Sequence, residues 1–253
     1  MGRGSKKCEG AGCRGHGEER DDPRAVPLSR RRLLGATIVG ATTSVLAGAG
    51  AEVVLPLAAR AQTMKSPAEA LQALVEGNRR FVERKLTFYQ DDLAILQQNT
   101  AEKQEPFASV LSCADSRVPV ELVFDQSIGH VFVNRVAGNI ATTEIMASIE
   151  YGAVVLGTKV IMVLGHSNCG AVKATIDGKA VPGQISSLYR FIRPAVDAAG
   201  ANLDAAAVAN AKIQAQLLKE SSPVLAELVK EGKLSVVAAF YDVASGKVTL
   251  LTR

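Results

Sequence analysis

Residues 160–170 read Val-Ile-Met-Val-Leu-Gly-His-Ser-Asn-Cys-Gly, an apolar run that leads directly to a histidine and a cysteine. Five successive apolar residues, without polar residues in alternation, are typical of a strand buried on both faces of a parallel sheet. Gly170 and Ala171 then begin a helical pattern. The stretch therefore predicts a buried strand over residues 160–164, a short polar loop and a helix.

Similar apolar runs occur elsewhere in the chain, at residues 107–112, 131–136 and 234–241. Helical patterns lie before and between the runs, at residues 66–82, 119–124, 142–156, 184–199 and 204–231. The first helical pattern has Ser66 as its N-cap and Pro67 at its first helical position.

Strands that alternate with helices imply right-handed crossovers and parallel pairing. The sequence therefore predicts an α/β fold whose central, mostly parallel sheet has about four strands and is flanked by helices. Residues 247–251, after the turn at Ser245-Gly246, could add an antiparallel edge strand.

Residues of the types that bind metal ions follow two of the predicted strands. Cys113 and Asp115 come after the strand at 107–112, and His166 and Cys169 come after the strand at 160–164. Open α/β sheets place their ligand sites at the carboxyl ends of the strands. Two thiols, one imidazole and one carboxylate suffice for a tetrahedral zinc ion, so we predict a zinc site at this edge.

Asp115 has a second possible partner in Arg117, two residues further along the chain. The alternative to a metal site is that both cysteines are buried as apolar residues and that Asp115 and Arg117 form only a salt bridge. Cys113 and Cys169 are, however, the only cysteines after residue 61, and each has a potential ligand within three positions. These spacings favour a metal site with a working Asp-Arg pair.

The N-terminal residues differ in character from the rest. Residues 1–28 are rich in Gly, Arg and Glu and have no apolar period, which predicts disorder. Ser29-Arg30-Arg31-Arg32-Leu33-Leu34 then opens an uncharged stretch that ends at Ala51. This pattern resembles a twin-arginine export signal, with Ala59-Arg60-Ala61 as the cleavage site, although Gly35 replaces the usual basic residue. We expect a signal over residues 1–61, a single zinc-dependent domain over residues 62–253, and a periplasmic location.

An uncleaved membrane anchor is the alternative, because residues 33–51 approach the roughly 20 apolar residues that span a bilayer. Their Gly and Ala content favours a removable signal. Cys8, Cys13 and His16 would be removed with the signal, and they lie in a segment too polar to fold around a metal ion.

The distribution of charge argues against a nucleic-acid partner. The chain has 29 basic and 25 acidic residues, of which 10 and 6 lie in residues 1–61, so residues 62–253 have 19 of each. Nucleic-acid-binding domains normally have a clustered basic face. Tryptophan is absent and aromatic residues make up only 4% of the chain, so stacking platforms are also missing.

The segments around the predicted ligands resemble those of the β-class carbonic anhydrases, from about Ala68 to the C-terminus. The matching segments are Cys113-x-Asp115-x-Arg117-Val118-Pro119, Phe124-Asp125-Gln126, Val136-Ala137-Gly138-Asn139, Ser148-Ile149-Glu150-Tyr151 and His166-x-x-Cys169-Gly170. The resemblance implies a homodimer or homotetramer in which the N-terminal helix reaches across the dimer. It also implies one Zn²⁺ per chain on Cys113, His166 and Cys169, with Asp115 either bound to zinc or paired with Arg117.

The same resemblance implies a reaction, the reversible hydration of CO2 to bicarbonate and a proton by zinc-bound hydroxide. Arg117 would hold Asp115 off the metal, and Asp115 would orient the hydroxide. For substrate binding it implies Gln104 as a donor to bicarbonate, Phe132 and Tyr151 as walls of an apolar CO2 pocket, and the backbone N–H of Gly170. Phe132 and Tyr151 as core residues, and Gln104 as a surface residue, are the alternatives.

Other functions remain open at this point: a hydrolase of carbonyl sulfide or carbon disulfide, a catalytically silent zinc-binding module, or a redox protein that uses Cys113 and Cys169. Gln104 and the Asp115–Arg117 pair favour CO2, and a closed structural zinc site would not need Arg117. Some members of the family have a second, regulatory bicarbonate site that uses a tryptophan. Because this chain has no tryptophan, we predict that this site is absent or altered. We expect membrane contact only through the export signal.

Overall fold

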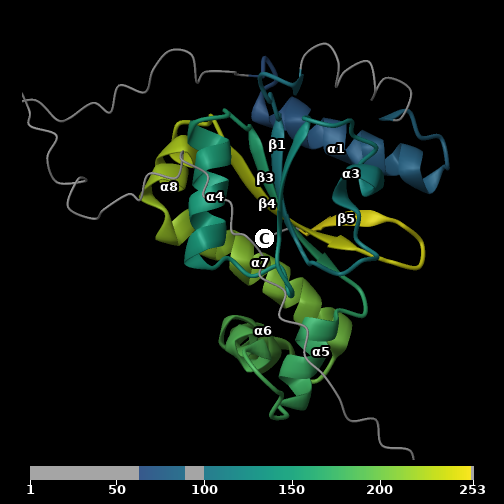
Figure 1. The fold of residues 1–253 in the computed structure, drawn as a ribbon, viewed down its shortest axis with the longest axis vertical. Helices are drawn as coiled ribbons and strands as arrows, with labels where there is room; N and C mark the ends of the chain where they lie inside the picture. Colours follow the sequence, from purple (N-terminus) through teal and green to yellow (C-terminus); the bar gives the residue numbers. More distant parts are fainter. Residues whose placement is uncertain (1–62, 89–99, 252–253) are drawn as a thin grey trace, which may run out of the picture. The chain divides into compact units, whose positions relative to one another are not determined.

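A five-stranded sheet with the strand order β2-β1-β3-β4-β5 forms the centre of the fold (Figure 1). The structure is a computed structural model that describes residues 63–88 and 100–251. The strands are β1 (Ala108–Ser112), β2 (Val131–Arg135), β3 (Val160–His166), β4 (Ser235–Tyr241) and β5 (Val248–Leu251). The first four strands pair in parallel, and β5 pairs antiparallel with β4. The predicted α/β fold, with its antiparallel edge strand, is confirmed.

Helices cover both faces of this sheet (Figure 1). Their bounds are α1 (Pro67–Val82), α3 (Val120–Val123), α4 (Thr143–Val154), α5 (Gly170–Asp177), the 3-10 turn η5 (Ile185–Leu188), α6 (Tyr189–Ala199), α7 (Leu203–Ser221) and α8 (Pro223–Lys230). Helices α1 and α3 contribute to the hydrophobic cluster on one face, and α4, α7 and α8 contribute to the cluster on the other.

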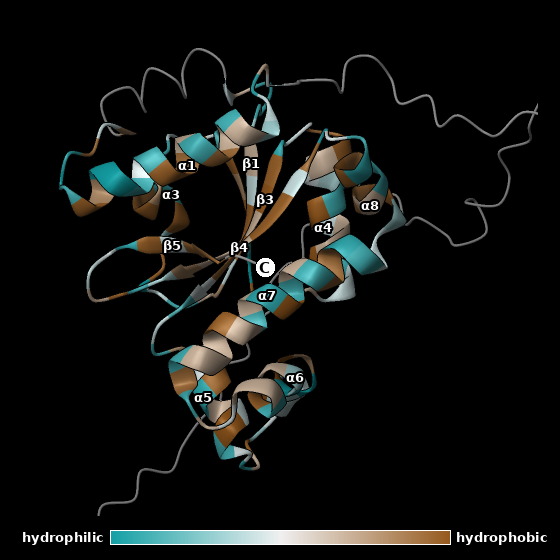
Figure 2. Cartoon of the chain, turned by 180° about the vertical axis from the view of Figure 1, so that it is seen from behind, coloured by the Kyte–Doolittle hydropathy of each residue, from teal (hydrophilic) through white to brown (hydrophobic). Residues whose placement is uncertain are grey.

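Burial on both faces explains the unbroken apolar runs of the sequence. All residues of β1 and β3 are buried. Val110 packs in the cluster of α1 and α3, and its neighbour Leu111 packs in the cluster of α4, α7 and α8, because successive side chains of a strand point to opposite faces. Figure 2 shows hydrophobic residues along the strands and a mixture of hydrophobic and hydrophilic residues along α1 and α7.

The N-terminal helix begins as the sequence predicts. The Ser66 side chain accepts a hydrogen bond from the N–H of Glu69, the Glu69 carboxylate accepts one from the N–H of Ser66, and Pro67 occupies the first turn. This reciprocal pair satisfies two backbone donors that a helix N-terminus leaves without partners. The helical pattern at residues 66–82 is thereby confirmed.

The helical pattern at 204–231 is two helices, which corrects the expectation of one. Pro223 has no N–H with which to continue α7, and Ser222 caps α8 by accepting a hydrogen bond from the N–H of Leu225. The Ser222 hydroxyl also donates to Glu150 Oε1 of α4 at 2.6 Å. The break therefore lets α8 pack beside α4 instead of extending α7.

A third cluster lies at the carboxyl ends of β1 and β3, where α5, α6 and α7 enclose Cys113 and Cys169. This cluster places the predicted metal ligands inside the protein. In the part of the chain that the structure describes, no helix is long and apolar enough to cross a membrane. The predicted signal, including residues 33–51, lies outside the described residues.

Candidate metal centre

The fold brings together the side chains of Cys113, His166 and Cys169. Cys113 directly follows β1, His166 is the last residue of β3, and Cys169 is the N-cap of α5. Because β1 and β3 are parallel neighbours, with Ser112 opposite Leu164, both strands deliver their following residues to the same edge. The two thiol sulfurs and an imidazole nitrogen lie within 4.8 Å of one another, and all three residues are buried.

The imidazole of His166 fits a metal ligand. Its Nδ1 lies 2.9 Å from the carbonyl oxygen of Ser167, which can only accept, so Nδ1 carries the proton. Nε2 is then left with a lone pair, and it is buried without a hydrogen-bond partner among the described residues. A buried acceptor without a donor is costly, whereas a histidine that donates to a carbonyl from one nitrogen commonly binds metal with the other.

The two thiols also suit a cation. The interaction with the Cys169 thiol, together with the N–H of Gly138, outweighs burial and lowers the pKa of Cys113. The hydrogen bond to Cys113, together with burial, raises the pKa of Cys169. Two adjacent buried thiols of this kind suit a metal ion, which binds cysteine as the thiolate.

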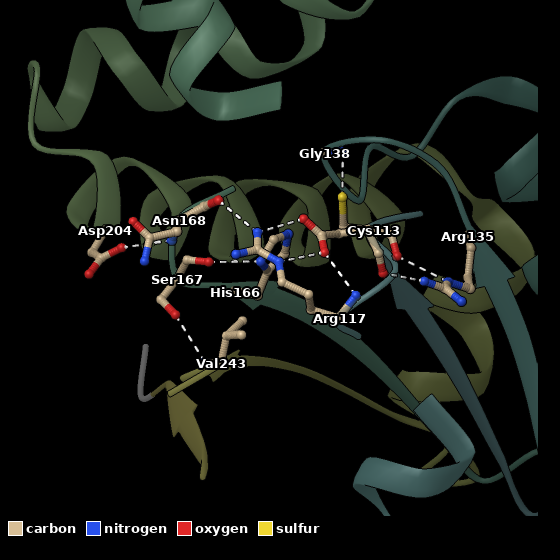
Figure 3. A network of polar contacts seen from close by, with 10 residues as sticks. Cys113, Arg117, Arg135, Gly138, His166, Ser167, Asn168, Asp204 and Val243 are labelled. Carbon is tan, nitrogen blue, oxygen red and sulfur yellow. Dashed lines mark hydrogen bonds and ion pairs between the residues drawn. The ribbon is translucent and has the colours of Figure 1, made fainter. Parts of the chain in front are cut away.

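Backbone N–H groups surround both sulfurs. The N–H of Gly138 donates to Cys113 Sγ at 3.3 Å (Figure 3). The backbone N–H groups of Ala171 and Val172, in the first turn of α5, act on Cys169 in the opposite sense to burial, since they lower its pKa. A helix N-terminus stabilises a thiolate in this way. The local environment therefore favours thiolate ligands.

Asp115 pairs with Arg117 instead of joining the cluster. Arg117 donates from Nε to Asp115 Oδ1 at 2.9 Å and from Nη2 to Oδ2 at 2.8 Å. The Arg117 backbone N–H also donates to Oδ1 at 2.9 Å. These hydrogen bonds hold the pKa of Asp115 well below its usual range. In this structure the Asp115 carboxylate is bound to Arg117.

Two arginines connect the loops that carry the cluster (Figure 3). Arg117 Nη2 donates to the carbonyl oxygen of Asn168 at 3.1 Å, which links the loop after β1 to the loop after β3. Arg135, the last residue of β2, donates to the carbonyl oxygens of Cys113 and Asp115 at 3.0 and 2.6 Å. The backbone around Cys113 is therefore held from both neighbouring strands.

A family model for carbonic anhydrase matches residues 108–248, a range that includes the cluster and the Asp115–Arg117 pair. The chain belongs to the β-class carbonic anhydrase family. It is 32% identical over 193 residues to the carbonic anhydrase of Mycolicibacterium smegmatis, which covers 73% of this chain and 93% of that relative.

Solved structures of this family have the same fold. A Coccomyxa β-carbonic anhydrase in complex with acetazolamide is 29% identical, with a TM-score of 0.57 over 72% of this chain and 86% of that one. A tetrameric β-carbonic anhydrase from Sordaria macrospora is 23% identical, with a TM-score of 0.58 over 73% of this chain and 98% of that one.

The structure does not bring Gln104, Phe132 and Tyr151 to the β-carbonic anhydrase cluster of their own chain. Phe132 pairs in register with Ser109, four residues before Cys113, a separation of roughly 13 Å along the sheet. Tyr151, which is 47% exposed, has its ring 6.2 Å from that of Phe132. Gln104 is exposed and precedes β1, which runs for about 16 Å before it reaches Cys113. All three residues therefore lie toward the amino ends of the strands.

Gly170 lies beside the cluster, as its position in the sequence requires. It is the first residue of α5, it is exposed, and a Cβ built on it would meet nothing within 4 Å. The backbone at this point is therefore open to a small molecule.

Sequence reasoning missed three residues that hold the site. Arg135 carried no signal beyond its place at a strand end. Asn210 and Gln214 are spaced by four residues among the alanines of α7, and both are buried. Polar residues in an otherwise apolar helical stripe are a usable signal, because buried amides need partners.

Proposed function

We propose that this chain is a zinc-dependent carbonic anhydrase that interconverts CO2 and bicarbonate, with one zinc ion per chain held by Cys113, His166 and Cys169. The observation that carries the proposal is the buried cluster itself: two thiols and a histidine nitrogen that has no hydrogen-bond partner among the described residues, beside an arginine-bound carboxylate. Three protein ligands are the number typical of catalytic zinc sites, whereas structural sites use four.

The residues around the cluster have separable roles. When bound, zinc would act as a Lewis acid that supplies a nucleophile from water at neutral pH. Arg117 keeps Asp115 ionised, so this carboxylate can only accept a hydrogen bond. It would therefore fix the direction of the proton of a hydroxyl at the site and leave the lone pairs of the hydroxyl oxygen free to attack CO2. Arg117 engages both oxygens of Asp115 and so keeps this carboxylate from becoming a fourth protein ligand.

We propose further that the active site is completed by a second copy of the chain. Gln104, Phe132 and Tyr151 lie too far from their own cluster to act there, and the exposed ring of Tyr151 stands against Phe132 on edge strand β2. A homodimer joined at this edge, with α1 contributing, would bring these residues to the partner's cluster. The Sordaria macrospora relative is tetrameric, which supports a dimer or a pair of dimers.

We also propose export to the periplasm through the twin-arginine-type signal of residues 1–61. The support is the sequence pattern alone. Replacing both Arg30 and Arg31 by lysine keeps the charge and should retain the protein in the cytoplasm, as fractionation and immunoblotting would report. Export of this variant at the parental level would contradict the proposal, and a parent that fractionates with membranes would indicate an uncleaved anchor at residues 33–51.

The substrate preference of the protein distinguishes CO2 hydration from the main alternative activity, the hydrolysis of carbonyl sulfide or carbon disulfide. Purified protein with one zinc per chain should hydrate CO2 rapidly and hydrolyse carbonyl sulfide and carbon disulfide slowly or not at all. Faster turnover of either sulfur compound than of CO2 would assign a sulfur-compound hydrolase, and full zinc content without turnover of any of them would assign a silent zinc-binding module.

A further inference from the structure

Two buried side chains of α7 hold the loop that contacts Cys113. Asn210, with 0% of its surface exposed, donates from Nδ2 to the carbonyl oxygen of Gly138 at 2.8 Å. Gln214, which is 1% exposed, accepts from the N–H of Ala141 at 2.9 Å through Oε1. The same residue that receives the Asn210 bond, Gly138, donates its N–H to Cys113 Sγ at 3.3 Å.

The two amides also fix each other. Gln214 Nε2 donates to Asn210 Oδ1 at 3.2 Å and to the carbonyl oxygen of Phe191 at 3.1 Å. The Asn210 Nδ2 group is thereby oriented toward Gly138, because its own oxygen is already engaged by a donor. The pair forms one connected network with its polar atoms satisfied, which is the arrangement that holds a buried segment in a single position.

The loop has little room to move. Gly138 has a φ of +79°, and a Cβ at this position would lie 2.6 Å from Cδ1 of Ile192 on α6. The peptide therefore lies directly against α6, and the Asn210 hydrogen bond fixes its carbonyl. The N–H and the carbonyl of Gly138 are joined through a single Cα. Anchoring the carbonyl therefore also limits the direction of the N–H.

We infer that Asn210 and Gln214 are positioning residues of the metal centre: they hold the Gly138 N–H on Cys113 Sγ and so set how much charge this sulfur gives to a bound metal ion. The inference rests on the zinc site of the proposed function. An N–H that donates to a thiolate stabilises its lone pairs, so losing the bond leaves a buried thiolate less stabilised. A merely structural role would change the stability of the protein but not the electronic state of Cys113.

The chain offers a matched control in Asn78. This residue of α1 is also buried, and its Nδ2 donates to the carbonyl oxygens of Val123 and Gly246 at 3.1 and 2.9 Å. Its Oδ1 accepts from the N–H of Val248 at 2.8 Å. Removing its amide therefore costs buried hydrogen bonds of the same kind, but in the cluster on the α1 side of the sheet.

The experiment compares the full-chain protein with Asn210→Leu and Asn210→Asp, and with Asn78→Leu and Asn78→Asp. The leucine variants remove the amide without adding charge, and the aspartate variants keep its shape. Each protein is loaded with zinc and titrated with a chromophoric chelator, and each is loaded with Co²⁺ to record the sulfur-to-metal charge-transfer band. If the Asn210 variants do not fold, Gln214→Glu is measured in their place. This variant keeps the oxygen that accepts from the Ala141 N–H but loses the hydrogen bonds that Nε2 donates to Asn210 and Phe191.

Both Asn210 variants should bind zinc about tenfold more weakly than the parent, and their charge-transfer band should move to longer wavelength, because the sulfur lone pairs lie higher in energy. The Asn78 variants should lose thermal stability but keep the parental zinc affinity and band. Parental values in the Asn210 variants, or equal shifts in the Asn78 variants, would overturn the inference. A parent that binds no metal would overturn the proposed function as well, so the two failures are distinguishable.

Discussion

Arg117 and Asp115 form a bidentate salt bridge, in which Nε and Nη2 of the arginine donate to Oδ1 and Oδ2 of the carboxylate at 2.9 and 2.8 Å. Both donors lie in the plane of one guanidinium group, so the contact fixes the orientation of the carboxylate as well as its charge. The Asp115 side chain is 17% exposed and the Arg117 side chain 47%. The pair therefore lies at the boundary between the buried cluster and solvent, where a small substrate would enter.

The geometry of this contact predicts the effect of Arg117→Lys. Lysine keeps the positive charge but lacks the coplanar N–H donors of a guanidinium group, so it cannot bind both carboxylate oxygens of Asp115 in one plane. We expect kcat/KM for CO2 hydration to fall by about 100-fold, while zinc content stays at one per chain. Stopped-flow rates with a pH indicator, together with metal analysis, measure both quantities. A lysine variant with parental kcat/KM would show that charge alone is sufficient.

Mixed dimers test whether Gln104 acts on the partner's cluster. Gln104→Ala removes the amide but leaves the metal ligands, and Cys169→Ser removes a ligand but leaves the amide. In a mixed dimer, the intact cluster of the first chain would receive Gln104 from the second. Co-expression with two purification tags should therefore restore clearly more activity than either variant has as a homodimer.

The alternative gives a different result in the same experiment. If Gln104 acted within its own chain, neither site of the mixed dimer would be complete, and its activity would equal the mean of the two homodimers. That result would contradict the second-copy proposal without affecting the zinc site.

The pH dependence of stability should report Asp125, whose side chain has 0% exposure. Burial tends to raise its pKa, but hydrogen bonds from Arg80, Phe88 and Thr87 outweigh burial and hold the pKa below the ordinary value of 3.8. A lowered folded-state pKa gives stability that is present above the unfolded pKa and is lost as the pH falls through the folded one. Asp125→Asn should therefore lower the free energy of unfolding by about 2 kcal/mol at pH 7.

The difference between the parent and Asp125→Asn should shrink as the pH falls below about 4, because Asp125 of the unfolded chain then binds a proton, and it should vanish once the pH falls below the lower folded-state pKa. Urea unfolding across the pH range measures it. Asp177→Asn is the control: its carboxylate pairs with Lys173 on the exposed surface of α5 at 3.0 Å, and such pairs contribute about 0.5 kcal/mol or less. A difference that is independent of pH would show that Asp125 acts through shape and not through charge.

The sequence predicts much of this fold because its local signals agree with the tertiary structure. The apolar runs are buried strands since both faces of the sheet are covered, and Cys113 and His166 fall at strand ends that parallel pairing brings together. The break at Ser222-Pro223 was missed because the apolar helical spacing continues across it, although the Ser-Pro pair is itself a helix-start signal.

The distance of Gln104 and Phe132 from the cluster of their own chain has a different cause. Gln104 and Phe132 come from the resemblance, and sequence proximity to Cys113 says nothing about the length of β1 that separates them from it. Asn210 and Gln214 could not be tied to Cys113 because their partners, Gly138 and Ala141, lie more than 70 positions away. Contacts of this kind depend on the packing of α7 across the sheet.

The measurement that tests the central claim most directly is stopped-flow CO2 hydration by the purified, zinc-loaded protein beside Cys169→Ser and Asp115→Asn. The account predicts rapid hydration by the parent, loss of both zinc and activity in Cys169→Ser, and loss of activity with zinc retained in Asp115→Asn. A parent that binds one zinc per chain but hydrates CO2 no faster than buffer would contradict the account.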